Sequence, residues 1–274
     1  MNLLKIKSKT QDKGELCLQK SINVLVVGGF GKMGKEVVNM ILSSNDLELV
    51  SVVDTTNHSE NNLPSNVFVG DDLKKAIEKS KPHVIVDFTL PKFALNNTLI
   101  ALQEKVSVVV GTTGLKSQDL DKIHISAEEK GVGVVVAPNF ALGAVLMMEI
   151  SKQIAKHFSE VEIIEMHNPK KADSPSGTAL KTAEDIAMNL KDNPVIYDAS
   201  PARGEIVNNI PIHSVRLTGL IAHQQVIFGA QGQTLTIKHD SYDRTSFMPG
   251  VALAIKKVVK CKGLVYGLEN LLDL

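Results

Sequence analysis

The chain has 274 residues, of which 43% are hydrophobic and 22% charged, and this is enough for one large domain or two modest ones with buried cores. Its 30 basic and 30 acidic side chains balance, which excludes a general attraction to nucleic acid or an anionic membrane, and we expect neither as a partner. No apolar run is long enough to span a membrane. Two cysteines far apart in the sequence, Cys17 and Cys261, form no disulfide framework or metal site, and we therefore predict a cytoplasmic protein without a bound metal.

Residues 1–20 are polar and lysine-bearing, which predicts a flexible N-terminal extension. From residue 22 onward, short β-branched runs alternate with stretches whose apolar residues recur at helical spacing. Such runs are typical of strands buried on both faces, and they cover residues 22–27, 47–53, 83–87, 106–110 and 132–136. Helices are predicted at residues 35–43, 71–80 and 117–130. Repeated βα units of this kind predict an α/β domain with a doubly wound parallel sheet over residues 21–140.

The pattern changes after Pro138. Helices are predicted at residues 142–157, 176–190 and 246–260, and strands at residues 161–166, 213–217, 224–229 and 233–239. The Pro- and Gly-bearing stretch 193–211 is interpreted as a loop. We therefore predict a second, α+β domain with a mixed sheet over residues 141–245, expected to hold the substrate. A C-terminal helix within residues 246–274 is expected to pack back on the first domain.

A glycine cluster follows the first predicted strand. Gly29, Gly31 and Gly34 match G-x-G-x-x-G, and Gly28 with the last two matches G-x-x-G-x-x-G. Glycine permits the tight turn and the close approach of backbone to a pyrophosphate, so the cluster predicts a Rossmann-type dinucleotide site, with an ordinary strand-to-helix turn as the alternative. Asp54 lies 20 residues past Gly34, where a carboxylate binds ribose hydroxyls. No arginine follows it, which favours NADH, but Lys32 leaves NADPH open.

Three further strand ends carry small, hydroxyl-bearing or aromatic residues. They are Asp87-Phe88-Thr89, Gly111-Thr112-Thr113-Gly114 and Ala137-Pro138-Asn139-Phe140. Ligands of doubly wound sheets bind at the carboxyl ends of the strands, so these loops predict a slot for nicotinamide. Each loop alone is also consistent with ordinary turn chemistry.

A polar loop in the second half carries the most distinctive group of residues. A predicted strand leads to His167 and Lys171, and Ser176-Gly177-Thr178 then begins a helix whose backbone N–H groups are able to bind a carboxylate. Reduction of a C=N bond needs a hydride and a proton, and lysine or histidine is able to supply the proton. The alternative is a solvated lysine-rich loop before an N-capped helix.

Taken together, the Gly28–Gly34 turn, Asp87-Phe88-Thr89, Gly111–Gly114, Asn139-Phe140 and the Glu165…His167…Lys171…Asp173…Pro175-Ser176-Gly177-Thr178 loop resemble the 4-hydroxy-tetrahydrodipicolinate (dihydrodipicolinate) reductase family. The resemblance extends from about residue 22 to the C-terminus. It implies NADH- or NADPH-dependent reduction of a cyclic imine in the diaminopimelate and lysine pathway. It also implies a dicarboxylate substrate and a cytoplasmic homotetramer that associates through the sheet of the substrate domain.

The resemblance also implies residue roles. His167 becomes a proton donor or acceptor, Lys171 the proton donor, and Gly177 and Thr178 hold a substrate carboxylate. The implied cofactor residues are Gly28, Gly29, Phe30, Gly31, Lys32, Met33, Gly34, Asp54, Phe88, Thr89, Gly111, Thr112, Thr113, Ala137, Pro138, Asn139 and Phe140.

Two positions depart from the family pattern. Asn168 replaces a histidine that contacts substrate, so it keeps a hydrogen bond without the charge, and Lys32 replaces an arginine. His213, Arg216 and Arg244 either approach the cleft or have structural roles. The functional alternatives are another NAD(P)-dependent amino-acid dehydrogenase on the same scaffold and a non-catalytic dinucleotide-sensing protein.

Overall fold

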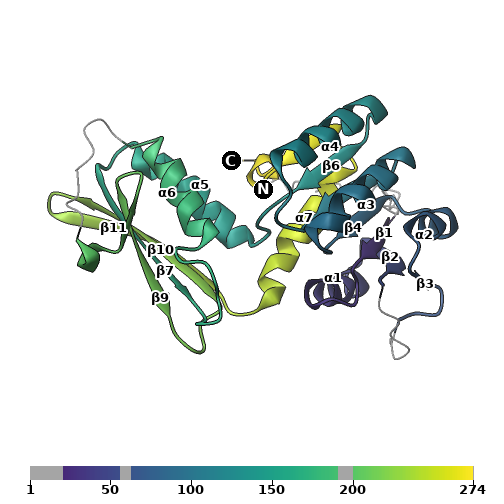
Figure 1. The fold of residues 1–274 in the computed structure, drawn as a ribbon, viewed down its shortest axis with the longest axis horizontal. Coiled ribbons are helices and arrows are strands. Elements are labelled where there is room, and N and C mark those ends of the chain that lie inside the picture. Colours follow the sequence, from purple (N-terminus) through teal and green to yellow (C-terminus); the bar gives the residue numbers. More distant parts are fainter. Residues whose placement is uncertain (1–20, 56–62, 191–199, 274) are drawn as a thin grey trace, which may run out of the picture.

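The structure, a computed structural model, describes residues 21–55, 63–190 and 200–273. Within these ranges the chain forms two lobes, each built around its own β-sheet (Figure 1). The extension predicted over residues 1–20 and the first part of the loop predicted over residues 193–211 lie outside the described residues.

The first lobe contains a seven-stranded parallel sheet. Its strand order is β12-β6-β5-β4-β1-β2-β3, and every neighbouring pair is parallel. The strands are β1 (Ile22–Val27), β2 (Leu47–Val53), β3 (Phe68–Gly70), β4 (Val84–Asp87), β5 (Ser107–Val110), β6 (Gly133–Val136) and β12 (Gly263–Tyr266). The order reverses direction between β1 and β4, which is where ligands bind in doubly wound sheets. The predicted α/β fold class is confirmed.

Helices cover both faces of this sheet. Helices α1 (Lys32–Leu42) and α7 (Met248–Val258) contribute to one hydrophobic core, and α2 (Leu73–Ser80), α3 (Pro91–Gln103) and α4 (Ser117–Lys130) contribute to the other. Successive residues of β1 alternate between the two cores, Val24 and Val26 in the first, Leu25 and Val27 in the second. Both faces are therefore buried, which explains why the strands are continuously apolar.

The C-terminal segment differs from the prediction of one helix within residues 246–274. A 3₁₀ turn, Arg244–Phe247, precedes α7, which ends at Val258, and the chain then returns to the sheet as β12. Gly263, the first residue of β12, adopts a φ of 76°, a left-handed conformation that glycine tolerates, and it and the apolar residues after it pair with β6. Because β12 has only four residues and its partner is distant in sequence, local pattern did not reveal it.

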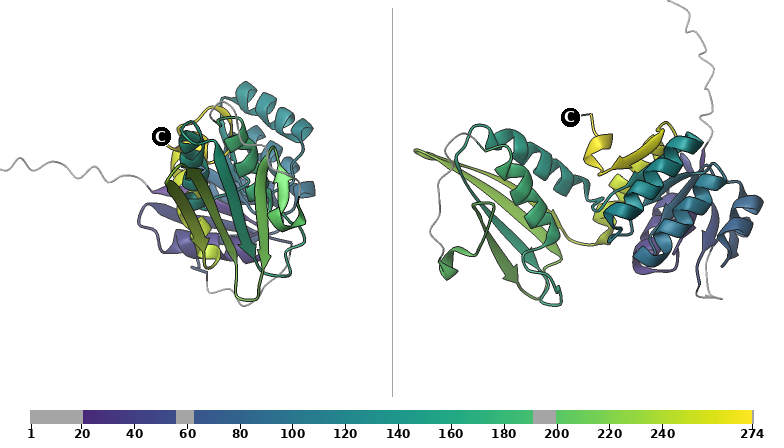
Figure 2. Two further views of the ribbon diagram at one scale, coloured as in Figure 1. Left: turned by 90° about the vertical axis from the view of Figure 1, so that its left-hand side faces the viewer. Right: turned by 45° about the horizontal axis from the view of Figure 1, so that its top comes forward.

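The second lobe contains a mixed sheet, as predicted, and this sheet has five strands in the order β11-β10-β7-β9-β8. Only the β7–β9 pair is parallel; the strands are β7 (Glu160–His167), β8 (Glu205–Val207), β9 (Ile210–Arg216), β10 (Ala222–Ala230) and β11 (Gln233–Ser241). Helices α5 (Leu142–Ala155) and α6 (Gly177–Ala187) pack on one face, around Ile163 and Phe228. Among the described residues, no helix covers the other face, which is seen directly in the left panel of Figure 2.

Residues 200–211 are more ordered than the loop interpretation of 193–211 allowed. They contain a 3₁₀ turn, Pro201–Arg203, the strand β8 and the start of β9. Asn208 and Asn209, at φ 49° and 63°, form a two-residue turn between β8 and β9. Positive φ at both central residues is what a tight hairpin requires, and asparagine tolerates it better than most residues.

Candidate functional site

The glycine turn has the geometry of a dinucleotide-binding turn. Gly28 adopts a φ of 77°, and a Cβ there would lie 2.8 Å from the carbonyl oxygen of Phe88. A Cβ on Gly34 would lie 2.0 Å from the carbonyl oxygen of Gly28, so only glycine lets α1 pack against the turn. Gly31 occupies the N-cap of α1 without a side chain to cap it. The first-turn amides and the positive end of the helix are therefore suited to a pyrophosphate.

A cavity of about 1000 Å³ lies beside this turn, at the carboxyl ends of β1, β2 and β4. The predicted cofactor residues that line it are Gly28, Phe30, Gly31, Asp54, Phe88 and Thr89. The Asp54 carboxylate accepts a hydrogen bond from the backbone N–H of Phe30 at 2.9 Å, which fixes it at the mouth of the turn. Asp71 and Asp72 add two carboxylates to the same wall. The cavity, the glycine cradle and the carboxylate fit a nicotinamide dinucleotide.

The other predicted cofactor residues lie in three kinds of surroundings. Thr113, Pro138 and Asn139 line a second cavity that reaches the other lobe. The side chains of Ala137 and Phe140 are buried in the core and line none of the three described cavities. The remaining predicted cofactor residues also line none of the three cavities; they are Gly29, Lys32, Met33, Gly34, Gly111 and Thr112.

Asp87, a residue to which sequence analysis gave no role of its own, holds two of these loops together. Its buried carboxylate accepts hydrogen bonds from the Thr89 hydroxyl at 2.7 Å and the Thr112 hydroxyl at 3.0 Å. The Asn97 side-chain amide adds a third at 2.8 Å. The loops after β4 and β5 are thus fixed relative to each other at the edge where a cofactor would bind.

The chemical loop of the second lobe faces the first lobe across two adjoining cavities of about 300 and 570 Å³. Both are lined by His167 and Lys171 together with Asn139 of the first lobe. Further residues common to both are Pro138, Ser176 and Thr178. The structure thus brings the predicted catalytic residues, a predicted carboxylate-binding residue and the β6–α5 loop of the nucleotide-binding lobe into one site. His223, His239 and Ser241 line the smaller cavity as well, and sequence analysis did not indicate them.

The start of α6 already binds a carboxylate, that of Asp173. The Ser176 hydroxyl caps the helix by accepting from Ala179 N–H at 3.2 Å, and Asp173 accepts from Gly177 N–H at 3.3 Å. The Lys171 ammonium lies 2.8 Å from the other Asp173 oxygen and holds the pKa of that carboxyl below its usual value. An ammonium and a helix-terminal amide therefore meet around one carboxylate, and a substrate carboxylate has the same chemistry.

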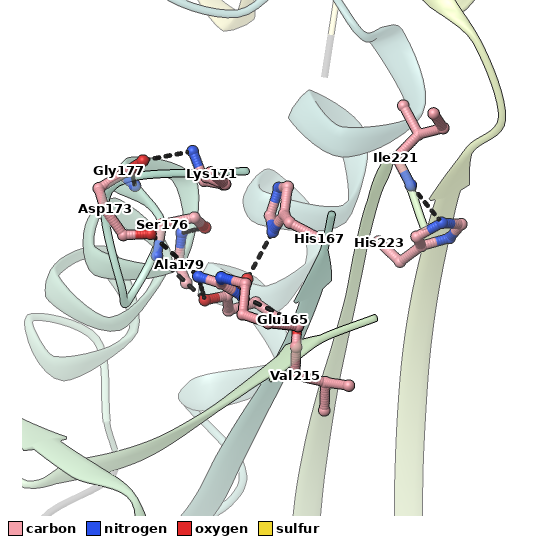
Figure 3. A network of polar contacts seen from close by, with 11 residues as sticks. Glu165, His167, Lys171, Asp173, Ser176, Gly177, Ala179, Val215, Ile221 and His223 are labelled. Carbon is pink, nitrogen blue, oxygen red and sulfur yellow. Dashed lines mark hydrogen bonds and ion pairs between the residues drawn. The ribbon is translucent and has the colours of Figure 1, made fainter. Parts of the chain in front are cut away.

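His167 belongs to a buried polar network (Figure 3). Its Nδ1 lies 2.5 Å from Glu165, which also receives a two-pronged contact from the Arg216 guanidinium at 2.6 and 2.9 Å. Burial lowers the pKa of His167; Glu165 opposes this shift, and the charges of Lys171 and Arg216 reinforce it. Burial acts to raise the pKa of Glu165, but hydrogen bonds from Arg216 and other neighbours outweigh it and leave that pKa low. The site therefore combines a buried carboxylate with a histidine biased toward its neutral form.

The remaining candidates are outside the cavities. His213 pairs with Glu162 at 2.8 Å, and Arg244 is exposed at the start of a 3₁₀ turn. Asn168 lies in the turn before Lys171, where its side chain accepts from the Lys170 N–H at 3.1 Å. In the ranges the structure describes, no group of three histidine, cysteine or acidic side chains is placed to hold a metal, and no helix is both long and apolar enough to cross a membrane.

Similarity to known proteins follows the same two-part division. The family model described as dihydrodipicolinate reductase, N-terminus, matches residues 22–140, and the one described as its C-terminus matches residues 143–272. The 4-hydroxy-tetrahydrodipicolinate reductase of Moorella thermoacetica is 46% identical over 263 residues, covering 92% of this chain and 98% of the relative. That of Bacillus subtilis is 45% identical over 264 residues, with 93% and 99% covered.

Solved structures indicate the same family. A dipicolinate-bound dihydrodipicolinate reductase from Paenisporosarcina sp. TG-14 superposes with a TM-score of 0.83 at 44% identity, covering 92% of this chain and all of that one. An amine dehydrogenase from Mycobacterium smegmatis, with a TM-score of 0.64 at 14% identity, shares the fold alone. Family models that together span nearly all of the described chain, and relatives of this identity over nine-tenths of it, leave one assignment. The chain belongs to the dihydrodipicolinate reductase family.

Proposed function

We propose that this protein is a 4-hydroxy-tetrahydrodipicolinate reductase, which uses NADH or NADPH to form tetrahydrodipicolinate for diaminopimelate and lysine synthesis. The observation that carries the proposal is the shared cavity, where His167 and Lys171 of one lobe face Asn139 of the nucleotide-binding lobe. The reaction takes up one hydride and one proton and releases the 4-hydroxyl group as water. A hydride donor on one side of the cavity and proton carriers on the other meet both requirements.

The cofactor, when bound, supplies the hydride. Asp54 is suited to bind its ribose, and the amides at the start of α1 its pyrophosphate. Thr113, Pro138 and Asn139, which line the cavity shared with the second lobe, are suited to hold the nicotinamide end near the substrate. In this proposal the first lobe binds and orients the cofactor and takes no part in proton transfer.

The second lobe binds the substrate and moves the proton. Gly177 N–H and the Thr178 hydroxyl hold one carboxylate of the dianion, which displaces Asp173 from the Gly177 N–H and from the Lys171 ammonium. Lys171 then donates its proton to the reduced ring. His167 accepts or returns a proton through Nε2, and Asn168, in the turn before Lys171, offers the substrate a neutral hydrogen bond.

The test is turnover. The full-length protein, given NADH or NADPH and substrate made in place by the preceding synthase, should oxidise the cofactor in proportion to the substrate formed. A folded protein that leaves NADH unchanged under these conditions, or that instead oxidises free amino acids with NAD⁺, would contradict the proposal and favour the amino-acid dehydrogenase alternative.

We also propose that the protein is a cytoplasmic homotetramer associated through the uncovered face of the second sheet. Ile164, Met166 and Ile227 are only partly buried in the single chain and lie on the face away from α5 and α6, as strand alternation requires. Partly buried apolar side chains of this kind favour association, and the same face also carries the charged Glu162. Light scattering after gel filtration should give a mass near four times the chain's 29.7 kDa. A mass equal to that of one chain would refute this proposal without affecting the reaction.

A further inference from the structure

We propose that the Glu165–Arg216 ion pair is a positioning device for proton transfer: it fixes His167 in the form that carries its proton on Nδ1, and it anchors the loop that carries Lys171. The inference rests on the proposed reductase function and extends it to two residues that line neither of the described cavities at the site. It rests on the arrangement of hydrogen-bond donors around Glu165.

The sheet places the three side chains together. Glu165 and His167 are two residues apart on β7, so they lie on the same face, the one packed against α6. Strand β9 runs parallel to β7 with Arg216 directly opposite His167. Glu165 is fully buried, with no exposed surface, and the Arg216 and His167 side chains are 19% and 15% exposed. The arrangement is therefore part of the rigid sheet and does not depend on a surface loop.

The contacts to the Glu165 carboxylate come from His167 and from hydrogen-bond donors, the Ser214 hydroxyl among them. One oxygen accepts from Arg216 at 2.6 Å and from the backbone N–H of Ser176 at 3.3 Å. The other accepts from Arg216 at 2.9 Å and lies 2.5 Å from His167 Nδ1. A guanidinium does not give up its proton in proteins, so Glu165 is an ionised acceptor. Nδ1 of His167 must therefore carry a hydrogen, which leaves Nε2 for the substrate.

Arg216 also determines the charge of the site. An unpaired buried carboxylate beside His167 would hold the imidazole in its protonated form. Because Arg216 neutralises Glu165, the burial of His167 prevails and its pKa is lowered. A neutral imidazole is able to accept a proton during turnover, and the two carboxylates of the substrate favour its protonation when they bind. The same pair thus sets both the orientation of the ring and its readiness to change charge.

The pair also contacts the stretch of the loop between Lys171 and α6. Arg216 donates to the backbone carbonyl of Asp173 at 3.0 Å, and Glu165 accepts from Ser176 N–H, where α6 begins. The Asp173 side chain in turn binds Lys171 on one side and Gly177 on the other. One ion pair therefore fixes the relative positions of the proton-carrying histidine, the proton-donating lysine and the helix start that binds a carboxylate.

The chain supplies a matched control on the same strand. Glu162 lies three residues before Glu165 on the opposite face, where it also binds one arginine and one histidine, Arg203 and His213. Glu162→Gln removes a carboxylate with the same kinds of partner but away from the cavity; because Glu162 shares its face with Ile164, on the side proposed for association, the mass of this variant is first matched to that of the wild type. Comparing Glu165→Gln with Glu162→Gln therefore separates the loss of positioning from the general loss of a charged pair.

We expect Glu165→Gln to lower kcat by about 10²- to 10⁴-fold, the range associated with general acid–base catalysis and with a misoriented catalytic histidine. The KM for NADH should change by no more than about twofold, since Glu165 does not contact the dinucleotide cavity. Glu162→Gln should keep kcat within about twofold of the wild type. Equal kcat values for the two variants would overturn the inference.

A second readout does not depend on activity. The ionisation of His167, followed by NMR of its ring in the NADH-bound protein and assigned with His167→Gln, should move to lower pH in Glu165→Gln. Removing the carboxylate takes away the group that raises this pKa and leaves the Arg216 charge that lowers it. An unchanged ionisation, even with reduced kcat, would overturn the inference, because a purely structural defect leaves that pKa in place.

Two complications remain separable. If Glu165→Gln does not fold, Glu165→Asp replaces it, because aspartate keeps the charge but withdraws the carboxylate by one methylene. Glu165→Asp should still lower kcat by at least about tenfold relative to Glu162→Asp. Equal kcat values for these two variants would refute the positioning role of Glu165. If the wild type itself shows no turnover, the proposed function fails, and the ring ionisation still decides whether Glu165 controls His167.

Discussion

Replacing Lys171 by methionine removes the ammonium group of the chemical loop and keeps an unbranched side chain of similar length. Its effect on stability is expected to be small. The Lys171 side chain is 28% exposed and its partner Asp173 is 54% exposed, and ion pairs in such surroundings contribute about 0–1 kcal/mol. Loss of a proton donor, by contrast, lowers turnover by about 10²- to 10⁴-fold, which is roughly 3–5 kcal/mol in the barrier. The kinetic effect should therefore far exceed the change in the free energy of unfolding.

The assay compares Lys171→Met with Lys170→Met, a change of the same kind at the exposed neighbouring residue. Steady-state kinetics with synthase-generated substrate should show the loss in kcat for the first variant alone, with the KM for NADH unchanged in both. Urea titration should give closely similar free energies of unfolding. Equal kcat values in the two variants would remove Lys171 from proton transfer, and a large loss of stability in Lys171→Met would show that the reasoning about its exposed ion pair is wrong.

Three further predictions concern the carboxylate site, the cofactor and pH. Thr178→Val, which removes one hydroxyl from the cavity, should raise the substrate KM by about tenfold with little change in kcat, and an unchanged KM would exclude Thr178 from substrate binding. Asp54→Ala should weaken NADH more than NADPH, so the ratio of their kcat/KM values should move toward NADPH; a constant ratio would count against ribose binding by Asp54. Folding lowers the pKa of His167 and of His239 from 6.5, and it lowers the pKa of Glu165 from 4.5. A group whose pKa is lowered on folding stabilises the folded state above its unfolded pKa. This contribution is lost as the pH falls through the folded pKa. The free energy of unfolding from urea titration should therefore decrease as the pH falls below 6.5 and decrease further below 4.5, whereas a value that rose on acidification would contradict these shifts.

Sequence pattern revealed the first lobe well because its strands are buried on both faces. The bounds of β1 and β2 agree with prediction at both ends, since continuous β-branched runs flanked by polar residues leave little ambiguity. The elements that pattern did not reveal are short and depend on distant partners. Strand β3 has three residues and pairs with β2, and β12 has four and pairs with β6. Sequence-local signals do not encode such pairings.

The candidate site shows the same division. The spacing of His167, Lys171, Gly177 and Thr178 placed them in one loop, and the structure gathers them around one cavity. Arg216, however, meets Glu165 from 51 residues away, so only the pairing of β7 with β9 reveals their contact. Glu165 was part of the motif that resembles the family, and strand alternation indicates that it shares a face with His167, but neither signal reveals its contact with Arg216.

The central claim is that a proton carried by the second lobe meets a hydride delivered from the first. A crystal structure of the full-length protein with NADH and dipicolinate, the ligand of the Paenisporosarcina relative, tests it most directly. We expect the Lys171 ammonium and His167 Nε2 to lie within about 3.5 Å of dipicolinate, between it and the second sheet, with nicotinamide on the opposite side. Dipicolinate bound outside this cavity, or a Lys171 side chain directed away from it toward solvent, would contradict the account.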